Sequence, residues 1–240
     1  MSTETSNPDS WIEIIDLTKR FHHLPVLNCL ALTIHDGECC LLVGDNGAGK
    51  TTLLRIIAGL TRPSQGHVSI CGTFAAGDPQ VRRRIGYVGH QPMFYQDLSV
   101  LENLAHYARL YHVNKARNAV LEAMDQAGLT RHQHQPVRTL SRGMQQRLSL
   151  ARATLHNPVI LLLDEPYTGL DQEAATALDA TLQHFHQRGH AILIAAHRPQ
   201  RILKITSHIA WLRDGAIDFH IPVDQIHATP KLQCYLQEVA

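Results

Sequence analysis

The 240-residue chain lacks an apolar run long enough to cross a membrane: the longest, such as Val159–Leu163, have the length of a buried strand, whereas a spanning helix needs roughly 20 residues. An excess of either charge is also absent, with 22 Lys and Arg against 21 Asp and Glu, and no basic run is interleaved with aromatics. This balance argues against nucleic acid as a partner. The five cysteines are odd in number and lack metal-binding spacing, so we expect reduced thiols in a cytosolic compartment.

The N-terminus is polar and acidic and carries no secretory signal, so we interpret residues 1–10 as a flexible tail and 11–240 as a single domain. Alternating apolar residues predict two antiparallel strands, near Ile12–Ile14 and Leu30–Ile34, joined by a loop at Phe21–Pro25. Further apolar runs of strand length are Cys39–Val43, Ile85–Val88, Val159–Leu163, Ala191–Ala195 and Ile209–Leu212. Helical periodicity is found in Lys50–Leu60, Leu101–Leu110, Lys115–Ala127, Arg142–His156 and Glu173–Gln187. We therefore expect an α/β fold with a mostly parallel sheet, an N-terminal antiparallel β part and a helical lobe inserted at about residues 95–157.

A glycine-rich loop joins the strand Cys39–Val43 to the helix that follows it. The loop fits the phosphate-binding pattern of Gly, four residues, Gly, Lys and Ser or Thr. Its residues are Gly44, Asp45, Asn46, Gly47, Ala48, Gly49, Lys50, Thr51 and Thr52. Backbone N–H groups and the helix dipole favour phosphate here, Lys50 would reach the outer phosphates, and the Thr51 hydroxyl would ligate Mg²⁺. The pattern predicts a P-loop NTPase core that binds ATP and Mg²⁺, with an ordinary glycine-rich turn as the alternative.

Two carboxylates, Asp164 and Glu165, end the apolar run Val159–Leu163. Ligands of parallel sheets bind at the carboxyl ends of the strands. Asp164 would hold Mg²⁺, and Glu165 would act as the catalytic residue that orients or deprotonates the water attacking the γ-phosphate. A turn formed by Asp-Glu-Pro is the alternative.

The segment Leu140–Arg147, shortly before these carboxylates, resembles the signature sequence of the ABC ATPases. That signature reads Leu-Ser-Gly-Gly-Gln in the family, so Ser141 and Gly143 match whereas Arg142 and Met144 depart from it. The resemblance implies an ABC-type ATP-binding domain in which the signature contacts the ATP bound by an opposite subunit. Ser141 is also a good N-cap for a helix, so a purely structural role is the alternative.

Four more residues take their roles from the same resemblance. Gln91 resembles the glutamine that couples the γ-phosphate and Mg²⁺ site to the helical lobe, and His197 resembles the γ-phosphate-sensing histidine, which makes both catalytic residues. Asp171 lies in a segment similar to the loop that crosses the dimer interface. Phe21 occupies the place of the aromatic that stacks on adenine, with a core aromatic as the alternative.

One chain carries one full set of these motifs, so the resemblance implies a homodimer with two equivalent ATP sites. Such a dimer would dock on a multi-spanning membrane permease subunit and lie peripherally on the cytoplasmic side of the cell membrane. The groove between the lobes, at Pro92–Tyr95, is the expected docking site, unless this patch belongs to the core. The chain ends soon after the ATP-binding domain, so we expect a compact exporter subunit.

Within the family, the chain looks most like the heme-exporter ATPase of cytochrome c maturation. The shared segments are Tyr87–Pro92, Leu98 with Glu102–Leu104, Leu140–Met144 and Asp164–Asp171. Drug and polysaccharide exporters resemble the same segments and remain alternatives. A soluble ABC protein acting on ribosomes or DNA is less favoured, because the chain has neither a second ATP module nor a long coiled-coil insertion.

The 17 histidines do not by themselves predict a metal site. His184 and His186 are two residues apart on a predicted helix and point away from each other. His22–His23 and His132–His134 lie in expected loops, where we expect them to be solvated.

Overall fold

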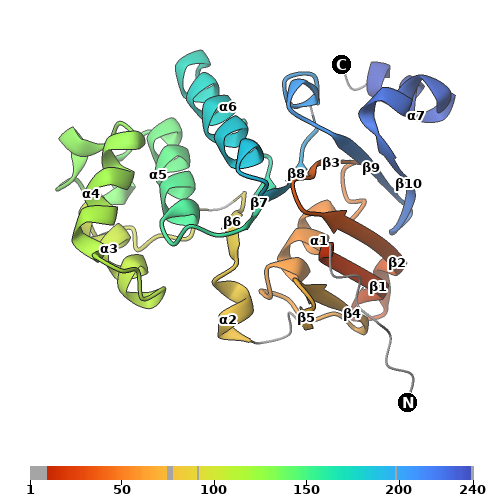
Figure 1. Ribbon diagram of the computed structural model, residues 1–240, viewed down its shortest axis with the longest axis horizontal. Coiled ribbons are helices and arrows are strands. Elements are labelled where there is room, and N and C mark those ends of the chain that lie inside the picture. The colour runs from red at the N-terminus through yellow and green to blue at the C-terminus, as the bar shows by residue number, and fades with distance from the viewer. Residues whose placement is uncertain (1–9, 75–77, 91, 198, 239–240) are drawn as a thin grey trace.

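The computed structural model describes residues 10–74, 78–90, 92–197 and 199–238. A helical lobe lies at one end of the molecule and a β-rich core at the other, with α6 between them (Figure 1). Residues 1–9 of the predicted tail lie outside the described residues, and so does Gln91.

A six-stranded sheet forms the centre of the core. Its order is β10 (Ala216–Pro222), β9 (His208–Arg213), β3 (Cys39–Val43), β8 (Ala191–Ala195), β7 (Ile160–Asp164) and β6 (Ile85–Val88). The strands from β9 to β6 are parallel, and β10 pairs with β9 antiparallel. Strands β3, β7 and β8 are buried along their whole length, because the sheet is covered on both faces. The mostly parallel sheet is confirmed.

A second, antiparallel sheet has the order β2 (Leu24–His35), β1 (Ser10–Phe21), β4 (Gln65–Ile70) and β5 (Thr73–Phe74). The loop predicted at Phe21–Pro25 was wrong in extent. Phe21 pairs with Leu24 and Arg20 pairs with Pro25, so only two histidines form the turn. A two-residue hairpin turn suffices here because His22 adopts a positive φ of 55°, and Pro25 is tolerated because β2 is an edge strand.

Helices cover both faces of the six-stranded sheet. α1 (Lys50–Ile57) packs between the two sheets through Leu53 and Ile57, whereas α6 (Gln172–Gln187) and α7 (Pro230–Glu238) pack on the opposite face through Leu182 and Leu232. The two faces thus have separate hydrophobic cores. The short helix α2 (Pro79–Arg82) precedes β6.

The helical lobe has a core of its own and confirms the three predicted helices: α3 (Val100–Leu110), α4 (Ala116–Gln126) and α5 (Arg142–Thr154). Ser99 and Glu102 form a capping box that fixes the start of α3. Short 3₁₀ helices occupy Thr130–His132, Val137–Thr139, Ile202–Lys204 and Val223–Ala228. Within the described part of the chain, none of the helices has the length and apolar character that crossing a membrane requires.

Candidate active site

Three of the sequence-predicted groups meet at one edge of the six-stranded sheet. Strands β3, β8 and β7 are neighbours, and their carboxyl ends lead into the phosphate loop, His197 and the pair Asp164–Glu165 respectively. The backbone N–H of Glu165 donates to the carbonyl of Ala195 at 2.9 Å, which ties the carboxylate segment to the end of β8. Parallel order alone therefore places these groups side by side.

The phosphate loop packs so closely on the core that two glycines are required. A Cβ on Gly44 would lie 2.2 Å from the carbonyl oxygen of Leu212 in β9. Gly49, the N-cap of α1, has φ 107°, and a Cβ there would lie 2.8 Å from Leu27. The loop therefore curves tightly into the helix N-terminus, where the free N–H groups and the dipole favour an anion.

Lys50 lies under this loop and is 7% exposed. Its ammonium group donates hydrogen bonds to the carbonyl oxygens of Gly44, at 2.6 Å, and Asp45, at 3.0 Å. Burial lowers the pKa of Lys50, and the carboxylates of Glu165 and Asp164 oppose this shift. The cation is thus held at the centre of the loop, close to the two carboxylates.

Asp164 and Glu165 each present a buried carboxylate oxygen without a hydrogen-bond partner in the described structure, Oδ2 and Oε1 respectively. Burial raises the pKa of Asp164, while a hydrogen bond from the Thr51 side chain favours its ionised form. Glu165 has φ 52°, a left-handed backbone that is uncommon for a non-glycine residue. An unpaired buried carboxylate oxygen costs free energy unless a ligand satisfies it.

These oxygens fit the requirements of Mg²⁺. The ion prefers hard oxygen ligands, typically one or two carboxylates with a hydroxyl, water and substrate phosphates. Thr51 and Asp164 supply the hydroxyl and the carboxylate and contact each other. Gln91, the third predicted ligand, lies outside the described residues.

His197 projects from the end of β8 toward the phosphate loop, where its Nε2 contacts Oδ1 of Asn46. The histidine predicted to sense the γ-phosphate therefore lies between the phosphate loop and the carboxylates, in the order that the strands dictate.

The predicted signature residues lie at the start of α5, a helix of the lobe, whereas the phosphate loop leads into α1 in the core (Figure 1). Ser141 is the N-cap and accepts from the N–H of Met144 at 3.3 Å. Arg142 is exposed, and its stem packs against Gly169, where a Cβ would lie 2.9 Å from Cδ of the arginine. Gly143 has open space around its Cα. Asp171 caps α6 by accepting from the N–H of Ala174 at 2.8 Å.

Phe21 is 47% exposed and has the ammonium of Lys19 4.7 Å from its ring centroid, so the alternative of a core aromatic is wrong. Near it in sequence, Pro25, Val26 and Asn28 line a cavity of about 510 Å³ together with the phosphate loop at Asp45–Ala48. This hollow adjoins the phosphate loop on the side of the β1–β2 hairpin.

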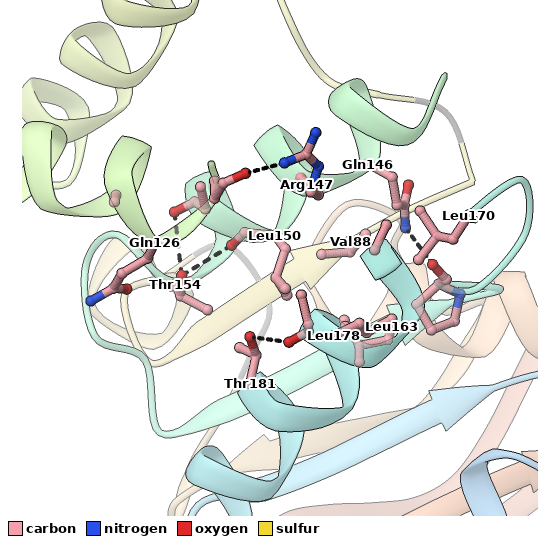
Figure 2. A pocket seen from close by; sticks show the side chains of 16 residues that line it. Val88, Gln126, Gln146, Arg147, Leu150, Thr154, Leu163, Leu170, Leu178 and Thr181 are labelled. Carbon is pink, nitrogen blue, oxygen red and sulfur yellow. Dashed lines mark hydrogen bonds between the residues drawn. The ribbon is translucent and has the colours of Figure 1, made fainter. Parts of the chain in front are cut away.

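Gln146, on α5, was missed by sequence reasoning. Its Nε2 donates to the carbonyl of Pro166 at 3.0 Å, directly after Glu165 in the chain. Figure 2 shows this contact at the rim of an apolar cavity of about 70 Å³, which lies between α4, α5 and α6. This direct hydrogen bond thus joins α5 to the Asp164–Glu165 segment, beside the cavity. No local pattern in the sequence marks this glutamine.

Residues 27–168 match the family model described as ABC transporter. The chain belongs to the ABC transporter family. It is 42% identical over 178 residues to the cytochrome c biogenesis ATP-binding export protein CcmA of Xylella fastidiosa strain Temecula1, covering 74% of this chain and 82% of that protein. It is 34% identical over 207 residues to the Nod factor export ATP-binding protein I of Cupriavidus pinatubonensis, covering 85% of this chain. The present chain spans only 64% of the length of that relative.

A solved ATP-binding cassette dimer, in a post-hydrolysis state bound to ADP and Pi, has the same fold as this ABC domain. Its TM-score is 0.81 and its sequence identity 26%, over 88% of this chain and 98% of that one. The expected fold class is therefore confirmed, and the domain is of an ATP-hydrolysing type.

Proposed function

We propose that this chain is the ATP-hydrolysing subunit of a membrane exporter, and that the exporter serves heme export for cytochrome c biogenesis. The observation that carries the ATPase part is the meeting of Lys50, Asp164 and Glu165 at the carboxyl ends of β3 and β7. A cation for phosphate, an oxygen ligand for a metal and a potential base are the groups that phosphoryl transfer to water requires.

Each side chain has a separate task in this proposal. Lys50 exchanges its bonds with the loop carbonyls for bonds with the β- and γ-phosphates of ATP. Glu165, whose Oε1 is buried and unpaired, accepts the proton of the attacking water. His197 binds the γ-phosphate from the β8 side. Bound Mg²⁺, held by Thr51 and Asp164 with Gln91, would neutralise charge on the β- and γ-phosphates.

We further propose a homodimer with two equivalent ATP sites. Ser141 and Arg142 lie at an exposed helix start on the helical lobe, so they are available to an ATP molecule bound by a second copy. The proximity of Arg142 to Gly169 would place the arginine beside the loop that includes Asp171. A two-fold axis makes both sites identical.

The permease subunit would dock on the groove between core and lobe, which places the chain peripherally on the cytoplasmic side of the membrane. Met93 and Tyr95 are 41% and 56% exposed, so they are not core residues. Met93 also lines a cavity of about 140 Å³ with Leu60, Tyr107 and Tyr111. The exposed aliphatic side chains of Leu60 and Met93 suit an apolar helix of a partner.

The heme cargo is supported by the short shared segments and by the 42% identity to the cytochrome c biogenesis relative. The 34% identity to the Nod factor relative, a protein named for another cargo, supports drug or polysaccharide export as the second candidate.

Purification of the tagged chain from detergent-solubilised membranes tests the transporter assignment. We expect a multi-spanning protein to co-purify, and its identity as a cytochrome c biogenesis component would support the heme cargo. Met93→Glu should release that partner, whereas Leu121→Glu, at an exposed leucine elsewhere on the lobe (43% exposed), should retain it. Recovery of ribosomal proteins in place of a membrane partner would contradict the proposal.

A further inference from the structure

A group of potential metal ligands lies at the opposite end of β3 from the phosphate loop and takes no part in ATP chemistry. Glu38 directly precedes β3, Cys40 lies within it, His208 begins β9, and His220 lies in β10. Cys40 is the register partner of His208, and His220 is the partner of Ala210, which in turn pairs with Leu42. Side chains in register share a face of the sheet, so both histidines and the cysteine lie on one face.

The side chains converge on Glu38. Its Oε1 lies 2.8 Å from Nε2 of His220 and 3.8 Å from Nδ1 of His208, and the two imidazole centroids are 5.5 Å apart. One ligand atom each from Glu38, Cys40 and His220 can be chosen so that all lie within 4.8 Å of one another. Ligands of a tetrahedral ion lie about 3.3–3.8 Å apart, because metal–ligand bonds are roughly 2.0–2.3 Å long, so small side-chain movements would bring these atoms onto one ion.

Two of these potential ligands are buried, which distinguishes the group from a cluster of solvated surface side chains. Glu38 is 3% exposed and Cys40 is fully buried, whereas the side chains of His208 and His220 are 32% and 24% exposed. Oε2 of Glu38 is held by the backbone N–H of His35 at 3.0 Å, which leaves Oε1 directed at the imidazoles. A buried carboxylate requires a compensating positive charge, and the partly open histidines offer a route by which an ion can enter.

We infer that Glu38, Cys40 and His220 bind a divalent cation of the zinc class, with His208 as the fourth ligand. The mixed sulfur, nitrogen and oxygen set matches what zinc takes in proteins and differs from the all-oxygen set that suits Mg²⁺. A divalent ion with one thiolate and one carboxylate is neutral overall, so it resolves the charge of Glu38 without adding a buried charge. Binding would release the thiol proton of Cys40 and replace the Glu38–His220 hydrogen bond.

Such an ion would have a structural role distinct from the catalytic Mg²⁺. It would link three adjacent strands, β3, β9 and β10, at the edge of the sheet remote from ATP. Strand β10 is the only antiparallel member of the six-stranded sheet, paired with β9 alone. An added link to β3 would therefore hold this edge strand at a second point besides its ladder with β9.

Titration of the chelator-treated, full-length protein with Co²⁺ tests the site, because a cobalt–thiolate bond gives a charge-transfer absorption that nitrogen and oxygen ligands do not. We expect saturation at one equivalent with this band and with the visible bands of a tetrahedral ion. The Mg²⁺ site contains no thiol, so Co²⁺ bound there cannot mimic the signal. A wild-type protein without the charge-transfer band at excess Co²⁺ would overturn the inference.

Adjacent cysteines supply the matched variants. Cys40→Ala should abolish the thiolate band, whereas Cys39→Ala, at an equally buried position on the opposite face, should keep it. If Cys40→Ala fails to fold by circular dichroism, His220→Asn provides the second test and should weaken Co²⁺ binding at least tenfold. The double variant His184→Gln/His186→Gln controls for binding to histidines outside the site and should match wild type. A retained band in Cys40→Ala, or unchanged affinity in His220→Asn, would contradict the site.

Discussion

At the scale of single residues, the contacts of Lys50 place its ammonium group inside the loop, where phosphate is expected to bind. Its ammonium is bound to the carbonyl oxygens of Gly44 and Asp45, which are neutral acceptors. Phosphate oxygens carry formal charge and accept stronger, charge-assisted hydrogen bonds. ATP can therefore replace these acceptors favourably while the loop keeps its curvature.

Replacing Lys50 by alanine should weaken ATP binding and turnover together. A hydrogen bond to a charged group contributes about 1.5–3 kcal/mol, which corresponds to a roughly 10- to 100-fold loss of affinity for one such bond. Calorimetric titration with ATP measures this loss. Lys231→Ala, at an exposed position of α7, is the control; equal affinities in both variants and wild type would mean that Lys50 does not contact phosphate.

At the scale of elements, His156 joins the end of α5 to β6. Its Nε2 lies 3.1 Å from the carbonyl of Ile85, its ring stacks on Tyr111 with centroids 4.0 Å apart, and its Nδ1 is buried without a partner. Burial lowers the pKa of His156 from 6.5 to about 4. The neutral imidazole is therefore the form that packs between lobe and core.

This shift makes stability depend on pH. Between pH 6.5 and about 4 the unfolded chain binds a proton that the folded protein does not. The free energy of unfolding is therefore highest above pH 6.5, with respect to this group, and falls as the pH is lowered towards 4. The loss is on the order of 3 kcal/mol. Urea unfolding of His156→Phe should show a shallower fall over this interval than wild type, even if its stability at pH 7 is lower; parallel curves would refute the shift.

The elements differ in how far the sequence could predict them. Continuous apolar runs identified β3, β7 and β8, because these strands are buried along their whole length. Helical periods identified the lobe helices, because each buries one face in the core of the lobe. β4 was missed because only its second half is buried, after Gln65 and Gly66 that read as a turn. The hairpin end of β1 was missed because strand pairing, not local propensity, keeps Phe21–Pro25 extended.

The same reasoning explains the site. Motif spacing found Lys50, Asp164 and Glu165 because their neighbours impose a strand-to-loop context. Gln146 and the Glu38–Cys40–His220 group could not be found in this way. They are assembled by long-range packing: the carboxylate and His220 are separated by 182 positions. Only the register of β3, β9 and β10 brings them together.

At the scale of the whole molecule, the exposed Arg142 connects the fold to the proposed dimer. A cation in the first turn of a helix is disfavoured by roughly 0.3–1 kcal/mol, and an anion supplied from outside would offset this cost. The proposed anion is the γ-phosphate of an ATP bound by the second subunit, to which Arg142 would act as an arginine finger. A side chain that merely faces solvent is the competing account.

Charge reversal separates the two accounts. Arg142→Glu should leave the ATP affinity of the monomer nearly intact while suppressing ATP-dependent dimerisation and turnover. Sedimentation with and without ATP measures dimerisation, and titration at low protein concentration measures affinity. Arg117→Glu, at an exposed position of α4, makes the same charge change away from the signature. Dimerisation of the Arg142 variant equal to that of wild type would leave only the solvent-facing account.

The assignment of Glu165 as catalytic base is the centre of the account, and Glu165→Gln tests it most directly. The amide keeps the size of the side chain but cannot accept the proton of the attacking water. We predict ATP affinity close to wild type, phosphate release reduced at least 100-fold and an ATP-bound dimer that accumulates, with Glu173→Gln in α6 behaving as wild type. Near-normal phosphate release by Glu165→Gln would contradict the account.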